Sequence, residues 1–148
     1  MKRCVLIGLA AGIGLGIAPA SAQAHHSYPT LFDLCQSVTI TGQVANVQWK
    51  NPHILIELKA DDGTRYLAEW TSVEGVTRVR NADALTLKAG DRLVVTGSPA
   101  RSAAQIRASY PALDPALTIV SALSQVRRPS DGWNWARAYA PPAECASR

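Results

Sequence analysis

The three histidines are the residues of this chain best suited to chemistry. His25 and His26 are adjacent near the amino terminus, and His53 lies in the short stretch Asn51-Pro52-His53. If processing makes His25 the first residue, its α-amine and its imidazole Nδ1 chelate one Cu(II) ion, and an imidazole of His53 or His26 adds a further donor. Cu(II) prefers such tetragonal sets of nitrogen donors. The sequence therefore predicts a Cu(II) site formed by His25, His26 and His53.

The amino-terminal segment determines whether His25 carries a free amine. Two basic residues precede an uncharged apolar run, residues 5–18, and small residues follow it. This layout is typical of a secretory signal peptide. The run of about fourteen residues is shorter than the roughly twenty that a membrane-spanning helix needs, so an uncleaved anchor is the weaker alternative. We expect residues 1–24 to be a signal peptide and residues 25–148 to form one periplasmic or secreted domain.

Two alternatives stay open at this terminus. Cleavage after Ala22 would leave Gln23 first and His25 third. The amine, two deprotonated amides and the imidazole would then form a square plane around Cu(II), provided that Gln23 does not cyclise. Otherwise the histidines are ordinary polar residues at a fraying terminus, and His53 only forms a hydrogen bond beside Pro52. No cluster of cysteines or carboxylates in the sequence supports a closed zinc site.

Charge and cysteine content narrow the classes of partner. Two of the fifteen Lys and Arg residues leave with the leader, so thirteen remain against eleven Asp and Glu residues. This balance, without a long basic run, gives little support to binding of nucleic acid or of a membrane surface.

Loss of Cys4 leaves Cys35 and Cys145, which usually pair in an oxidising compartment. We therefore expect a Cys35–Cys145 disulfide, with two free thiols as the alternative.

Alternating apolar residues predict an all-β fold with one short helix. Within residues 38–44 the apolar side chains alternate onto one face of a strand, whereas Val47 and Trp49 fall on the opposite face. This change indicates a bulge at Gly42 or at Ala45-Asn46.

The next two apolar runs predict a hairpin. A three-residue loop ending at Gly63 pairs Leu58 with Tyr66 and Ile56 with Ala68, which buries both apolar sets on one face. It also gives Gly63 the left-handed position that such loops require.

The remaining elements complete a small barrel. Thr71 and Glu74 have the spacing of a capping box, which predicts a helix of two or three turns. A strand with Leu93 and Val95 inward follows, then a long loop over residues 99–115, a last strong strand and an irregular tail. The order strand, strand, strand, helix, strand, strand is that of the five-stranded Greek-key barrel called the OB fold. A simple meander or a sandwich is the alternative.

Carboxylates and tryptophans are weaker candidates for function. Glu57, Glu69 and Asp91 could act as paired acids, but the strand pattern predicts that they lie on a solvated outer face. Trp133 and Trp135 lie in the tail, where they either cover an open end of the barrel or form an aromatic platform for a partner or a sugar. The disulfide tether of the tail favours the covering role.

Four stretches resemble a family of small exported bacterial proteins of unknown function. They span most of residues 24–101 and read AHHSYPTLFD, VTITGQVANVQWKNPHILIEL, LAEWTSVEGVTRVR and LKAGDRLVVTGSPAR. Trp49 together with Asn51-Pro52-His53 is the most specific part, and the resemblance also carries over to His25 and His26. It implies export and brings no established activity.

Together these features predict an exported protein that binds rather than catalyses. The first hypothesis is the handling of periplasmic copper through His25, His26 and His53. The second is a metal-free module that binds a protein, a peptide or a sugar through a strand face and through Trp133 and Trp135. An oxidative copper enzyme is the least supported hypothesis, because nothing in the sequence indicates a substrate cleft.

Overall fold

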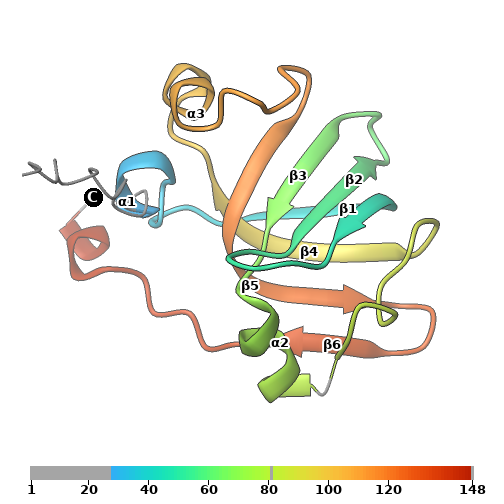
Figure 1. The fold of residues 1–148 in the computed structure, drawn as a ribbon. Coiled ribbons are helices and arrows are strands. Elements are labelled where there is room, and N and C mark those ends of the chain that lie inside the picture. Colours follow the sequence, from blue (N-terminus) through green and yellow to red (C-terminus); the bar gives the residue numbers. More distant parts are fainter. Residues whose placement is uncertain (1–27, 81, 148) are drawn as a thin grey trace, which may run out of the picture.

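The computed structural model describes residues 28–80 and 82–147. The predicted signal peptide, residues 1–24, and the two adjacent histidines, His25 and His26, lie outside the described residues. Strands dominate the rest of the chain (Figure 1). The elements are, in order, α1 (Tyr28–Leu31), β1 (Val38–Gln48), β2 (Leu55–Ala60), β3 (Arg65–Glu69), α2 (Val73–Arg80), β4 (Arg92–Pro99), α3 (Ala103–Ser109), β5 (Thr118–Arg128), β6 (Trp133–Ala136) and the 3₁₀ helix η1 (Ala143–Ser147).

Five of the strands close into a barrel. The sheet order is β3-β2-β1-β4-β5-β6, and an additional parallel pairing between β3 and β5 closes the ring. All other pairings are antiparallel, and α2 connects β3 to β4. This is the order of the OB fold, so the predicted mainly-β barrel is confirmed.

The predicted strand registers are confirmed in detail. Leu58 pairs with Tyr66 and Ile56 pairs with Ala68, and Gly63 has a φ of 85° in the connecting turn. The register of β1 against β2 shifts between Val44 and Asn46, which selects the second of the two predicted bulge positions. Because each bulge bends its strand, this shift lets one long strand pair with both β2 and β4.

Apolar side chains fill two regions, one inside the barrel and one outside its wall. Inside, Leu93, Val95 and Ile56 are fully buried, and each such side chain contributes about 1.5–3 kcal/mol through burial. Outside, α1 and α3 cover β3 and β5 through a second cluster, formed by Leu31, Phe32, Leu67, Ile106 and Ile119. Strand β3 is therefore buried on both faces.

Several local predictions are wrong. The expected loop over residues 99–115 contains α3, whose first turn is capped by the Ser102 hydroxyl accepting from the Gln105 N–H. The tail begins with β6, which pairs with β5. Ser72, not Thr71, caps α2, since its hydroxyl accepts a hydrogen bond from the Gly75 N–H. In the described part of the chain, none of the helices has the length and apolar character needed to cross a bilayer.

Candidate functional site

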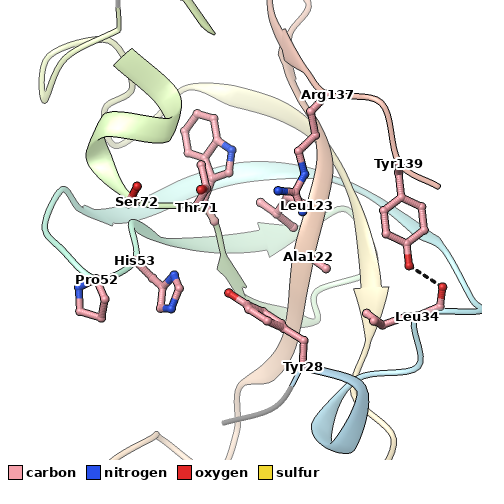
Figure 2. Close-up of a pocket in the computed structure, with 11 residues that line it drawn as sticks. Tyr28, Leu34, Pro52, His53, Thr71, Ser72, Ala122, Leu123, Arg137 and Tyr139 are labelled. Carbon is pink, nitrogen blue, oxygen red and sulfur yellow. Dashed lines mark hydrogen bonds between the residues drawn. The ribbon is translucent and has the colours of Figure 1, made fainter. Parts of the chain in front are cut away.

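A pocket of about 430 Å³ opens at the end of the barrel where β3 leaves the sheet and β5 bends (Figure 2). Four parts of the chain contribute to its wall: α1 with the segment after it, the turn before β2, the connection from β3 to α2, and the bend of β5 with the tail after β6. Its polar lining consists of Tyr28, His53, Thr71, Ser72, Arg137 and Tyr139. Segments far apart in the sequence thus meet at one opening.

The Asn51-Pro52-His53 turn places an imidazole at this pocket. Asn51 Oδ1 accepts a hydrogen bond from the Val73 N–H at 3.1 Å, which holds the turn against the first residue of α2. The Asn51–Pro52 peptide bond is cis. The side chain of His53 is 33% exposed, and its ring lies edge-on to the ring of Tyr28 with the centroids 6.1 Å apart. The motif therefore connects α2, β2 and the pocket.

The two ring nitrogens of His53 have different surroundings. Nε2 lies 3.8 Å from Oε1 of Glu69. Nδ1 is buried and has no hydrogen-bond partner within the described residues. A metal-binding histidine commonly directs one nitrogen at the metal and the other at a carboxylate or carbonyl. Nδ1 is therefore the ring nitrogen of His53 that has no protein partner among the described residues, and it is closed to solvent.

Glu69 is a residue of this site that the strand pattern places wrongly. The pattern predicts a solvated carboxylate, but Glu69 is only 3% exposed. Its oxygens accept hydrogen bonds from the hydroxyls of Tyr28 at 3.1 Å, Tyr110 at 2.7 Å and Ser121 at 3.3 Å. Tyr28 belongs to α1 and Tyr110 follows α3, so these two helices cover the outer face of β3. Each tyrosine is 41 positions from Glu69, and no local pattern reports such a contact.

This network also shifts the titration of its tyrosines. Burial, followed by the charge of Glu69, raises the pKa of Tyr28 to about 12. Burial, followed by the hydrogen bond to Glu69, raises the pKa of Tyr110 as well. Both hydroxyls therefore remain protonated donors to the carboxylate well above neutral pH.

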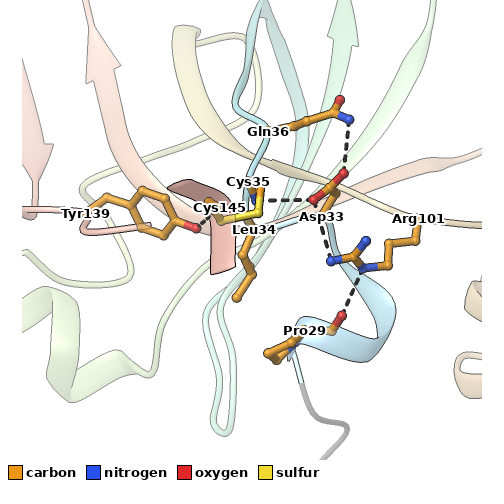
Figure 3. The surroundings of a disulfide bond; sticks show 8 residues. All are labelled: Pro29, Asp33, Leu34, Cys35, Gln36, Arg101, Tyr139 and Cys145. Carbon is orange, nitrogen blue, oxygen red and sulfur yellow. Dashed lines mark hydrogen bonds and ion pairs between the residues drawn. A yellow bond between two sulfur atoms is a disulfide. The ribbon is translucent and has the colours of Figure 1, made fainter. Parts of the chain in front are cut away.

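A disulfide secures one wall of the pocket (Figure 3). Cys35 and Cys145 are bonded with an S–S distance of 2.06 Å, which confirms the predicted pair. The bond joins the segment after α1 to η1. Close by, the Tyr139 hydroxyl donates a hydrogen bond to the Leu34 carbonyl, and the Cys35 N–H donates to Asp33 Oδ1 at 3.2 Å. The wall formed by Leu34 and Tyr139 is thus tied at two points.

An aromatic cluster lies behind the pocket. Trp70 is central, with edge-on neighbours Trp49, Trp133 and Trp135 at centroid distances of 6.3, 6.2 and 5.1 Å. Trp70 and Trp135 are each 1% exposed, whereas Trp133 is half-buried. Trp135 therefore packs into the barrel core, and Trp133 retains an accessible edge. A binding role for Trp133 and Trp135 stays a prediction.

The predicted metal donors are placed only in part. His53 lines the pocket, whereas His25 and His26 lie outside the described residues. Within residues 28–80 and 82–147, no three His, Cys, Asp or Glu side chains form a group suited to a metal ion. A copper site at this pocket would therefore need donors from the amino-terminal residues.

The closed barrel with its terminal pocket defines the chain as a small β-barrel protein. Residues 14–107 match a family of unknown function, DUF6152, and the chain belongs to this family. The resemblance to a family of unknown function is thereby confirmed, while export stays a prediction. No curated protein and no solved structure matches the chain significantly.

Proposed function

We propose that this is an exported, periplasmic protein that binds Cu(II) at the mouth of the pocket. The α-amine and imidazole of His25 form the primary chelate, His53 supplies the donor from the barrel, and His26 is available as a further donor. The protein binds copper as a carrier, sensor or scavenger rather than as an oxidative enzyme.

The observation that carries this proposal is the contact between Tyr28 and His53. The described chain begins at Tyr28, and the ring of Tyr28 lies edge-on to the imidazole of His53. His25 is three residues earlier, a span of at most about 10 Å for an extended chain. The histidine expected at the processed terminus is therefore within reach of the one histidine on the barrel, and no large rearrangement of the barrel is needed.

The surroundings of His53 give a second argument. Its Nδ1 lacks a hydrogen-bond partner in the described residues, and its Nε2 is directed at Glu69. The carboxylate is itself held by three hydroxyl donors, so its negative charge keeps a fixed position 3.8 Å from Nε2 and favours a cation bound to this ring.

The first test establishes the terminus and the metal together. Intact-mass analysis of the exported protein, with and without Cu(II), should show a chain that starts at His25 and holds one copper ion in an excess of glycine. A chain that starts elsewhere, or copper that glycine removes, would contradict the proposal.

The second test asks whether the barrel takes part. Replacement of His53 by Ala should weaken Cu(II) binding by about tenfold or more, which corresponds to about 1.4 kcal/mol. Lys50→Ala changes an exposed residue in the same turn and serves as the matched control, with unchanged affinity. Equal affinities for the two variants would limit the copper to a local chelate at the terminus.

The metal-free alternative predicted from the sequence has less support. It requires Trp133 and Trp135 as a platform, but Trp135 is buried against Trp70. Only Trp133 offers an accessible edge, and Arg128 lies 6.0 Å from its ring centroid.

A further inference from the structure

We infer that the pocket itself is a binding site for a small organic carboxylate, with Arg137 as its counter-charge. The ligand would have an apolar body of a few carbons and a single negative charge. This site shares the pocket with His53, one of the copper donors proposed above, but its counter-charge is a different residue, and it would be occupied in metal-free protein as well.

Arg137 is the group that indicates an anion. It follows β6 directly, and its backbone N–H donates to the Ser124 carbonyl at 3.0 Å, which fixes its position beside β5. Its side chain extends into the pocket with the guanidinium among the lining residues (Figure 2). In the described part of the chain Arg137 has no ion-pair partner. Ion pairs occupy Arg65, Arg78, Arg92, Arg101 and Arg128, and Arg107 and Arg127, which also have none among the described residues, do not line this pocket.

The buried carboxylate of Glu69 does not neutralise this charge. Glu69 is not part of the pocket lining, and its oxygens accept hydrogen bonds from the hydroxyls of Tyr28, Tyr110 and Ser121. The guanidinium is therefore free to form the two parallel hydrogen bonds that suit a carboxylate. A dianion such as a phosphate ester fits less well, because the pocket offers one arginine and lies beside the negative charge of Glu69.

The apolar side chains in the pocket wall favour a ligand with an apolar body. Leu34, Leu123, Trp70 and the ring of Tyr139 supply apolar surface to the pocket wall. The volume of about 430 Å³ lies at the lower end of the range for sites that bind small molecules. Such a pocket suits a compact acid with an aromatic ring or a branched chain, and it is too small for a long chain of sugars.

The backbone conformation at the pocket is a further argument for a ligand-binding site. Ala122 lines the pocket and has a φ of 49°, a left-handed conformation that costs energy for a residue other than glycine. It lies in the bulge where the register of β5 against β4 shifts. Strained residues of this kind concentrate at ligand sites, and this one gives the pocket its inner edge.

The test uses phenylacetate as the probe and phenylacetamide as its neutral counterpart, with metal-free mature protein in EDTA. Binding is followed by the fluorescence of the tryptophan cluster, since Trp70 lines the pocket, and by calorimetry. Phenylacetate should bind saturably, and phenylacetamide about tenfold more weakly, because it lacks the charge that the guanidinium recognises.

A pair of arginine variants locates the interaction. Arg137→Gln should weaken phenylacetate binding about tenfold or more and leave phenylacetamide unchanged. Arg127→Gln removes the same charge from an exposed position on β5 outside the pocket and should bind as the unmodified protein does. Absence of saturable binding, equal affinity for acid and amide, or equal affinity in the two variants would each overturn the inference. None of these outcomes depends on copper, so they leave the copper proposal to its own tests.

Discussion

Replacement of Glu69 by leucine should destabilise the protein strongly, although leucine suits a buried position. Glu69 is 3% exposed, and its carboxylate accepts hydrogen bonds from Tyr28, Tyr110 and Ser121. After the substitution Ser121 still has the Glu69 backbone carbonyl at 3.4 Å, because the main chain is unchanged. The two phenol hydroxyls lose the carboxylate as an acceptor.

The magnitude follows from these two lost hydrogen bonds. A hydrogen bond to a charged group is worth about 1.5–3 kcal/mol, so two of them set an upper limit of about 3–6 kcal/mol. Removing a buried charge recovers part of this amount, because the desolvation cost of the carboxylate is removed as well. We expect a net loss of about 2–4 kcal/mol in the free energy of unfolding, measured by urea denaturation.

A set of variants separates the hydrogen bonds from general effects on packing. Glu57→Leu alters a half-buried carboxylate on the neighbouring strand and should change the stability by less than about 0.5 kcal/mol. Combining Glu69→Leu with Tyr28→Phe and Tyr110→Phe removes donors and acceptor together, and this should restore at least half of the lost stability. If Glu69→Leu were as stable as Glu57→Leu, or if the triple variant were weaker still, the account of the network would be refuted.

Three further predictions concern the same region. The raised pKa values mean that the folded state holds the protons of Tyr28 and Tyr110 more tightly than the unfolded state. Their contribution to the free energy of unfolding should therefore be fully present and independent of pH below about pH 10, and should be lost as the pH rises toward 12, with a smaller fall in Tyr28→Phe; denaturation curves across this range would show it, and an identical fall in both proteins would contradict it. Replacing Cys35 and Cys145 with serine opens a loop with a sequence separation of 110, which should cost about 2–4 kcal/mol in urea denaturation; an unchanged midpoint would argue against the bond. Trp135→Ala should cost about 3–5 kcal/mol because the side chain is 1% exposed, and Trp133→Ala clearly less; equal losses in thermal denaturation would show that both residues cover the core alike.

The barrel could be predicted because the patterns that indicate its strands and turns lie within short stretches of the sequence. Strand alternation and the position of Gly63 determine the register of the β2–β3 hairpin, and both appear directly in the sequence. The disulfide follows from the expected compartment and from the count of cysteines left after processing. A change of phase within β1 predicted a bulge at Gly42 or at Ala45-Asn46, and the structure has it at the second position.

The packing of α1 and α3 over the barrel could not be predicted, because it depends on contacts between residues that are far apart in the sequence. The burial of Glu69 requires Tyr28 and Tyr110 to meet over β3, which no periodicity in β3 reveals. The helix α3 left one faint local signal, the capping spacing of Ser102 and Gln105, within a segment bounded by prolines. Arg137, the proposed counter-charge, had no local signal, because its place at the pocket comes from the pairing of β6 with β5 and from its own backbone bond to Ser124.

The pairing of β5 with several strands limits where related chains can gain or lose residues. The first part of β5, residues 118–121, pairs with β3 and β4, and its second part, residues 125–128, pairs with β4 and β6. One amino acid inserted or deleted between these two parts would turn one half of the strand over and exchange its inner and outer faces. Related chains should therefore differ in length at the connection over residues 110–117 and keep the number of residues in this strand constant.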